Sequence, residues 1–410
     1  MTAGTGTGAA AGAPRPDPDV EFAPTLEDVD AFIAATVIPL EDRHRELLDD
    51  PRRRFDPSGS YAEEVLELKR RVRTAAAGAG LYALAAPADC GGGGAGPSQQ
   101  YAVWEHLYRT CGPNRLLPYD VVAHPSGGPG PAFALLSPEA RGDALPGLMS
   151  GQDVLCVAFT ELGEGIATIA TPEGDGWVLD GTKHWVSRGP YAGRALVFAV
   201  TDRHHRGGDG LTAFLVSATA PGFRVESVSR ILGRVGGEEA TVSLSGVRVA
   251  AGDVVGEVHE GRAVSAVLNA AGDCFTAGRF VGLARWALER TVRFVADDGS
   301  LASDAAVRRL LADAAIDIHA ARRMSIGTVQ LMDAGRAAGM ERAMTRTHVV
   351  EMCGRVYERC MQIHGGSGLT NDAGFFDGWH QVRIVLSALG PGDPLRARIA
   401  DRLSQGDLAL

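Results

Sequence analysis

The stretch that decides the fold reads GWVLDGTKHWVS and covers residues 176–187. Its apolar and polar side chains alternate along part of its length and include β-branched and aromatic residues, which is typical of a half-buried β-strand. Further short segments of this kind, separated by Gly, Asp or Pro turns, run from residue 154 to residue 255. We therefore predict a central β-domain over residues 152–257, because a segment of about one hundred residues is long enough for a domain.

Helical patterns lie on both sides of this β-domain. From Leu26 onward, apolar residues recur at helical spacing in stretches such as LEDVDAFIAATVIPL, which predicts an N-terminal helical domain over residues 25–151. Long helical stretches return after Ala263 and predict a four-helix bundle over residues 258–410. Residues 1–24 are rich in Gly, Ala and Pro and are predicted to form a disordered tail. The predicted fold class is α+β, in three parts.

The overall composition disfavours several classes of protein. The chain has 410 residues, of which 45% are hydrophobic, and this is enough to bury the core of an enzyme. Its formal net charge of −10 argues against binding to nucleic acid or to an anionic membrane surface, since both need clustered Lys and Arg. None of the six cysteines forms a Cys-x-x-Cys pair, so we predict neither a metal site nor a disulfide framework. Without a recognisable signal peptide or membrane span, the sequence predicts a cytoplasmic protein.

Two stretches of the β-domain carry the side chains that a flat heteroaromatic cofactor needs. VAFTELGEG, residues 157–165, offers the hydroxyl of Thr160 before a Gly-x-Gly turn. GTKHWVS, residues 181–187, offers the indole of Trp185 and the hydroxyl of Ser187. An aromatic face can stack on such a cofactor while hydroxyls bind its ring nitrogens and carbonyls. The alternative interpretation is an ordinary β-hairpin, because short motifs of this kind often occur by chance.

The C-terminal stretch MQIHGGSGLT, residues 361–370, favours the cofactor interpretation. It follows TELGEGIAT, DGTKHWVS and LGRVGGEEATVSLSGVRV along the chain. In order and in type, these stretches resemble the acyl-CoA dehydrogenase superfamily from about Leu26 to Arg402. The resemblance implies that family's three-part architecture, an FAD cofactor, an acyl thioester substrate and a homodimer or homotetramer.

The resemblance also implies which residues contact the FAD. The first two stretches would hold the flavin ring, and the last would approach the FAD of a neighbouring subunit. The alternative role of Gly365 and Gly366 is to end a helix, where glycine at positive φ is favoured, and both roles are compatible. The implied cofactor contacts are Val157, Phe159, Thr160, Gly165, Ile166, Trp185, Ser187, Gln362, Gly365 and Gly366.

Departures from the family pattern concern the catalytic base. Dehydrogenases of this family carry a carboxylate before a Gly-Thr or Gly-Pro pair, and this carboxylate removes the substrate α-proton. In the corresponding LSALGPGD stretch, Leu389 takes the place of the acid, and a leucine side chain cannot accept a proton. Some relatives carry the base on the helix that opens the C-terminal domain, where Gly272 aligns with it. Asp273 is then the nearby candidate, with a solvated acid on a helix surface as the alternative.

Two of the family's cofactor contacts are also changed. Asp298 aligns with an arginine that meets the FAD pyrophosphate, and its negative charge would repel phosphate. Ile166 and Ala167 replace a Ser-Asp pair after the Gly-x-Gly turn. The resemblance therefore implies a better preserved site for the flavin ring than for the phosphates.

Three functions are compatible with this pattern. The first is an FAD-dependent oxidoreductase of lipid or secondary metabolism, acting on an acyl group carried by CoA or a carrier protein, or on a related small molecule. The second is a flavin monooxygenase, which needs no α-proton base because its chemistry uses activated oxygen. The third is a base-less subunit that forms a heteromer with a catalytic paralogue.

Overall fold

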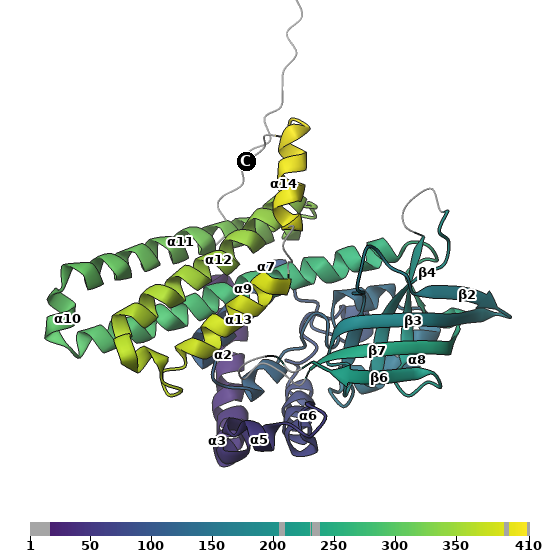
Figure 1. Cartoon of the computed structure of the whole chain (residues 1–410), viewed down its shortest axis with the longest axis horizontal. Helices are drawn as coiled ribbons and strands as arrows, with labels where there is room; N and C mark the ends of the chain where they lie inside the picture. The colour runs from purple at the N-terminus through teal and green to yellow at the C-terminus, as the bar shows by residue number, and fades with distance from the viewer. Residues whose placement is uncertain (1–16, 205–209, 230, 232–237, 389–392, 408–410) are drawn as a thin grey trace, which may run out of the picture.

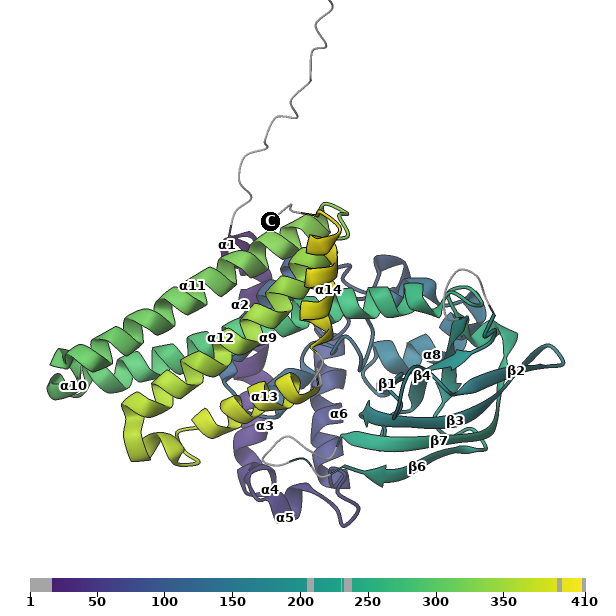
Figure 2. The ribbon, with the colours of Figure 1, turned by 45° about the horizontal axis from the view of Figure 1, so that its top comes forward.

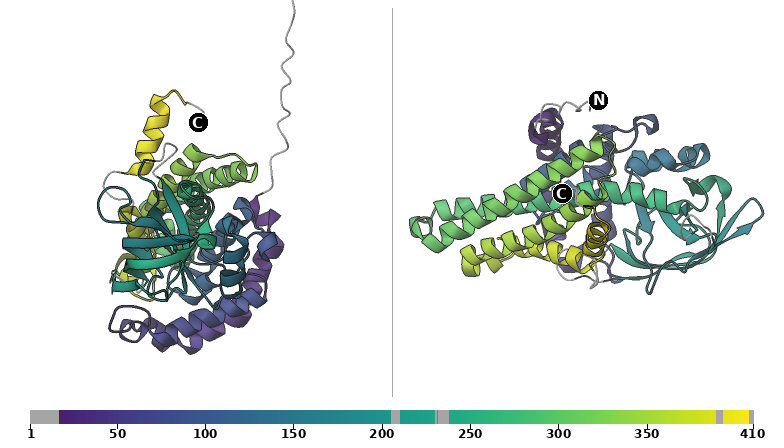
Figure 3. Two further views of the ribbon diagram at one scale, coloured as in Figure 1. Left: turned by 90° about the vertical axis from the view of Figure 1, so that its right-hand side faces the viewer. Right: turned by 90° about the horizontal axis from the view of Figure 1, so that it is seen from above.

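The computed structural model describes residues 17–204, 210–229, 231, 238–388 and 393–407. The chain begins with helices, continues into a β-sheet and ends in long helices, and Figure 1 shows the sheet at one end of the molecule and the long helices at the other. The view from above in Figure 3 shows the same separation. The predicted α+β fold class is confirmed. No helix among the described residues is long and apolar enough to cross a membrane.

The N-terminal region is built from short helices around two longer ones. Helix α7 is amphipathic and begins at a proline, which is favoured in the first turn of a helix because it needs no N–H partner there. Figure 2 shows α6 between the C-terminal helices and the sheet. The α-helices are α1 (Pro18–Glu21), α2 (Ala23–Phe32), α3 (Ile38–Arg43), α4 (Arg45–Asp49), α5 (Pro51–Arg54), α6 (Glu63–Gly78), α7 (Pro97–Cys111) and α8 (Pro138–Met149).

The prediction of a disordered tail over residues 1–24 is wrong for its last part. Residues 17–24 contain α1 and the start of α2, while residues 1–16 lie outside the described residues. The Asp17 side chain accepts a hydrogen bond from the Asp19 N–H at 3.1 Å and caps α1. Its carboxylate also pairs with Arg322 Nη1 at 2.7 Å. A long-range ion pair orders this segment, and composition alone could not reveal it.

The strands of the described residues form one eight-stranded sheet. Its order is β6-β7-β3-β2-β4-β5-β8, with β1 paired in parallel to β4. The longest pairing, between β3 and β7, is antiparallel and shifts register between Lys183 and Val186. Such a bulge adds a residue to one strand and turns its side chain outward. The strands are β1 (Leu155–Ala158), β2 (Ile169–Glu173), β3 (Gly176–Ser187), β4 (Arg194–Val200), β5 (Leu211–Ser217), β6 (Phe223–Val228), β7 (Glu239–Ala250) and β8 (Val254–Val255).

The C-terminal helices pack closely against the N-terminal region through α9 and α7. Glycines at positions 278 and 282 of α9 make this possible, because a Cβ at Gly282 would clash with the backbone oxygen of Glu105 on α7. Trp104 and Phe275 meet edge to face at 4.8 Å between ring centroids. These helices are α9 (Gly261–Ala296), α10 (Gly299–Ser303), α11 (Ala305–Asp333), α12 (Gly339–His364), α13 (Phe375–Ala388) and α14 (Pro394–Ser404).

Candidate active site

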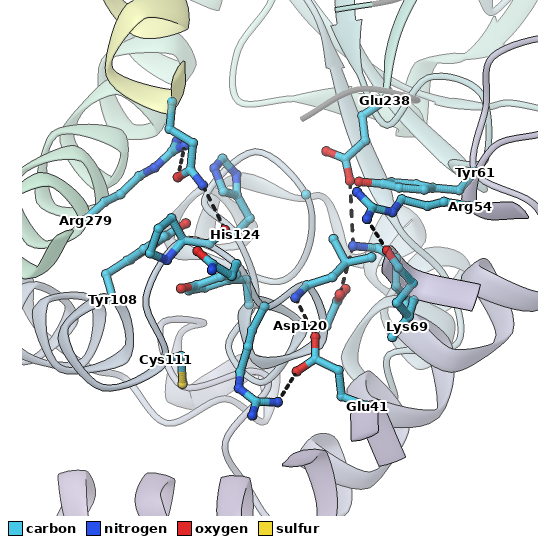
Figure 4. Close-up of a pocket in the computed structure, with 18 of the residues that line it drawn as sticks. Glu41, Arg54, Tyr61, Lys69, Tyr108, Cys111, Asp120, His124, Glu238 and Arg279 are labelled. Atoms are coloured by element: carbon cyan, nitrogen blue, oxygen red, sulfur yellow. Dashed lines mark hydrogen bonds and ion pairs between the residues drawn. The ribbon is translucent and has the colours of Figure 1, made fainter. Parts of the chain in front are cut away.

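A cavity of about 570 Å³ lies where the N-terminal helices, the sheet and the C-terminal helices meet. We call it the central cavity. Figure 4 places Arg279, His124 and Tyr108 on one side of it and Tyr61, Lys69 and Glu238 on the other. Its volume is in the range typical of small-molecule sites, and its lining mixes aromatic rings with charged groups.

A buried ion pair joins the two sequence stretches that were predicted to hold the cofactor ring. Lys183 Nζ lies 2.7 Å from Glu161 Oε1, and the lysine side chain is fully buried. Glu161 also accepts hydrogen bonds from the Ala167 N–H at 2.8 Å and the Thr168 hydroxyl at 2.7 Å. Although burial opposes ionisation, the hydrogen bonds from Lys183 and Thr168 hold the pKa of Glu161 below its ordinary value. The loop after β1 is thereby fixed to β3.

Trp185 is presented outward by the bulge in β3. Its φ of 56° lies in the left-handed region, which is strained for a bulky residue, and it is 57% exposed. Such strain is often found at functional sites. The neighbouring His184 N–H donates to the Thr160 carbonyl oxygen at 2.8 Å. The structure therefore brings Thr160 and Trp185 close together, and Ser187 lies two residues further on, at the central cavity.

The other predicted ring contacts are less exposed or lie in the adjoining loop. Val157 and Phe159 are half-buried and pack on an apolar cluster of the sheet, where Phe159 meets Phe198 at 4.9 Å between ring centroids. Gly165 is exposed at φ 75°, and Ile166 is half-buried. Their cofactor contacts stay predictions.

Gln362, Gly365 and Gly366 lie at the opposite end of the molecule from the Trp185 strand. They are exposed at the end of α12, near its turn into α13, as Figures 1 and 2 show. Gly365 has φ 57° and follows the last helical residue, as the helix-ending alternative requires. Within one chain, these residues and Trp185 are therefore not brought together.

Of the two predicted base positions, the structure describes Asp273. Leu389 lies outside the described residues. Asp273 is directed toward α12, where it pairs with Arg342 Nη2 at 2.8 Å and Arg346 Nη1 at 3.2 Å. It is absent from the lining of the cavity. This placement argues against Asp273 as the proton acceptor. The role of Asp273 is instead to form ion pairs that join α9 to α12.

Asp298, which aligns with the phosphate-binding arginine, has a local structural role. It is exposed and accepts hydrogen bonds from the backbone N–H groups of Ser300 at 2.9 Å and Leu301 at 3.4 Å. These contacts cap the short helix α10. The capping hydrogen bonds thus explain the position of the Asp298 side chain, and no phosphate contact is needed.

Sequence reasoning missed two adjacent carboxylates at the start of β7. Glu238 accepts a hydrogen bond from the Tyr191 hydroxyl at 2.8 Å and lies 3.7 Å from Lys69 Nζ and 3.8 Å from Arg188 Nη1. Glu239 accepts one hydrogen bond, from the Ser187 hydroxyl at 2.8 Å, and forms no ion pair within the described part of the chain. Burial and the charge of Glu238 raise the pKa of Glu239, although Ser187 opposes the shift. The only sequence signal was the Glu-Glu pair in LGRVGGEEATV.

Other charged residues near Glu238 form ion pairs or hydrogen bonds with one another and with neutral side chains. Asp120 lies 2.9 Å from Lys69 Nζ and 3.2 Å from Arg73 Nη1. Arg188 Nη2 donates to His124 Nδ1 at 3.1 Å and to the Ser126 hydroxyl at 2.8 Å. These residues come from α6, from the position after β3 and from separate loops, so no short motif could have revealed their grouping.

Comparisons with known proteins agree with this architecture. The acyl-CoA dehydrogenase middle-domain model matches residues 156–247, and the C-terminal-domain model matches residues 274–404. The 3-(aryl)acrylate reductase of Clostridium sporogenes is 24% identical over 373 residues, which are 87% of this chain and 96% of that protein. The human mitochondrial short-chain specific acyl-CoA dehydrogenase is 27% identical over 337 residues, 80% of each chain.

A solved structure shows the same fold. The acyl-CoA dehydrogenase of Bacillus anthracis complexed with FAD has a TM-score of 0.77 at 20% identity, over 95% of this chain and 68% of that chain. The two family models together cover more than half of the residues. The chain therefore belongs to the acyl-CoA dehydrogenase superfamily.

Proposed function

We propose that this chain is an FAD-dependent oxidoreductase that transfers hydrogen to or from an acyl thioester or a related unsaturated acid. The observation that carries the proposal is the Trp185 platform, an exposed indole held in a strained conformation two residues before Ser187, which lines the central cavity. The Glu161–Lys183 ion pair fixes this platform to the adjoining loop. The FAD complex of the Bacillus anthracis relative supports the choice of cofactor.

The residues present fit the ring of FAD better than its phosphates. Trp185 would stack on the flavin, and the hydroxyls of Thr160 and Ser187 would bind its polar edge. Asp298 is occupied as a helix cap and supplies no positive charge. Gln362 and its two neighbouring glycines are exposed on the far end of the bundle, so they would reach an FAD only in a second copy of the chain. This supports a homo-oligomer.

Glu239 is the residue that we assign to proton transfer. It lines the central cavity, the one side-chain partner it has among the described residues is the Ser187 hydroxyl, and its pKa is raised by burial. In the direction of oxidation, the substrate Cα–H bond would break with its proton moving to a Glu239 carboxylate oxygen. FAD, when bound, would supply the hydride acceptor for the hydrogen at Cβ, so that the substrate would gain a Cα=Cβ double bond. In the direction of reduction, Glu239 would return the proton to Cα.

The two carboxylates, Glu238 and Glu239, would have different roles in catalysis. Glu238 lies within ion-pair distance of Lys69 and Arg188, while Glu239 has no cationic partner among the described residues. A pair of acids in different environments is a common arrangement for acid–base catalysis. A carboxylate in the cavity favours an active enzyme over the base-less partner subunit.

The proposal is tested by mixing the FAD-loaded protein with acyl-CoA in the absence of oxygen. Butyryl-CoA and 3-phenylpropionyl-CoA serve as oxidisable probes, and the matching enoyl-CoA esters and free 3-phenylacrylate serve as probes for chemically reduced protein. We expect loss of the visible flavin absorbance with a saturated probe, or its return with an unsaturated one. Flavin that responds to none of these probes but reacts with oxygen after reduction would instead support a monooxygenase.

A further inference from the structure

Arg279 on α9 lines the central cavity, and no carboxylate of the described residues forms an ion pair with it. Its Nη2 donates to Gln381 Oε1 at 2.8 Å. Its Nε is buried without a hydrogen-bond partner, and within the described residues its guanidinium forms no ion pair. The cations on the opposite wall differ, because Lys69 and Arg73 both lie within ion-pair distance of Asp120. Arg279 is half-buried, and a guanidinium that is partly withdrawn from water without a counter-charge is stabilised by a ligand that supplies one.

We infer that Arg279 binds a free carboxylate of the substrate, so that this cavity takes an acid with a flat, apolar body. The inference rests on the proposed function and deepens it, since it names the substrate class of the same site. The planar guanidinium suits a carboxylate because two parallel N–H groups can meet its two oxygens. Gln381 accepts a hydrogen bond from Nη2 of the guanidinium and so fixes its orientation.

His124 supplies a second donor on the same side of the cavity. Its Nδ1 lies 3.1 Å from Arg188 Nη2 and 3.1 Å from the Ser126 backbone nitrogen. Both of these groups can only donate, so Nδ1 must accept and the proton of the neutral ring is on Nε2. Burial, together with the charges of Arg188 and Arg279, holds the pKa of His124 well below its ordinary value, which keeps the ring neutral. The Nε2–H group has no partner among the described residues and could donate to a carboxylate.

Aromatic rings around Arg279 define the shape of the ligand body. The guanidinium carbon lies 5.5 Å from the ring centroid of Tyr108 and 5.7 Å from that of Phe275. Tyr108 stacks on Tyr119 at 4.2 Å between centroids, with 16° between the ring planes. All three rings line the cavity. Flat walls beside a cation favour a planar conjugated acid over a flexible saturated chain.

The test compares a carboxylate with its neutral isostere by calorimetry. The probes are 3-phenylacrylate and 3-phenylacrylamide, which differ in charge but hardly in shape, and the flavin content of every protein is measured alongside. We expect the parent to prefer the acid by about ten- to a hundredfold, the size expected of a charge-assisted hydrogen bond. Arg279→Gln should abolish the preference, and Arg279→Lys should keep part of it. Arg293→Gln, an exposed position of the same helix, should change nothing.

Several results would overturn the inference. Equal affinity of the parent for acid and amide would do so, as would the absence of any binding up to millimolar acid. An Arg279→Gln protein that loses flavin but keeps its preference for the acid would show that the arginine serves the cofactor. A parent that binds no flavin, yet prefers the acid through Arg279, would contradict the proposed function and leave the carboxylate site standing.

Discussion

At the scale of single residues, the neighbours Glu238 and Glu239 have identical side chains in different electrostatic environments. Glu238 is ion-paired, whereas Glu239 has a pKa raised by burial and by its neighbour. Because a base must be ionised to accept a proton, the rate of proton removal should rise with pH through this raised pKa. Sequence inspection finds the pair but cannot assign the roles, because these depend on Lys69 and Arg188, which are distant in sequence.

The different environments of the two glutamates let us predict the effect of the Glu239→Gln substitution. The substitution should slow exchange of the α-proton of a bound acyl thioester with D₂O by about 10²- to 10⁴-fold, the usual contribution of a general base. NMR of the recovered thioester measures the exchange. The matched control is Asp273→Asn, which changes an acid outside the cavity. Equal slowing in both variants, or slowing in the control alone, would remove Glu239 from the mechanism.

At the scale of elements, the Glu161–Lys183 pair holds the loop after β1 against β3. Lys183→Met should leave the Glu161 carboxylate buried without its partner, and breaking a buried pair costs about 3–5 kcal/mol. Urea denaturation measures the loss in the free energy of unfolding. The double variant Glu161→Gln, Lys183→Met should recover part of it, because no charge is then left unpaired. A single variant as stable as the parent would contradict this account.

The sequence predicts the elements better than it predicts their irregularities. Alternation in GWVLDGTKHWVS predicts β3, and helical periodicity predicts the long helices, because both patterns are local. The bulge that exposes Trp185 depends on register with β7, and the order of α1 depends on Arg322 of a distant helix. Arg279 was not predicted for the same reason, since an absent ion pair is visible only in three dimensions.

At the scale of the whole molecule, Trp185 and the end of α12 lie far apart within one chain. We therefore predict that the end of α12 contacts the FAD bound by a second copy of the chain. Gly366 is exposed, and a Cβ added there would meet no atom of its own chain within 4 Å. Gly366→Glu should therefore fold normally but weaken both association and flavin binding. Analytical ultracentrifugation and flavin content measure these effects. The control is Gly142→Glu on α8, where a Cβ also meets nothing within 4 Å, and equal behaviour of both variants would show that the end of α12 has no such role.

The central claim, that Trp185 presents a platform for the flavin ring, is tested most directly by titrating the purified protein with FAD. We expect the parent to bind FAD with a change in its visible absorption spectrum. Trp185→Phe should keep most of the affinity because it retains an aromatic face, and Trp185→Ala should weaken binding by about 1 kcal/mol or more through lost stacking. Identical FAD affinity in all three proteins, or no FAD binding by the parent, would contradict the account.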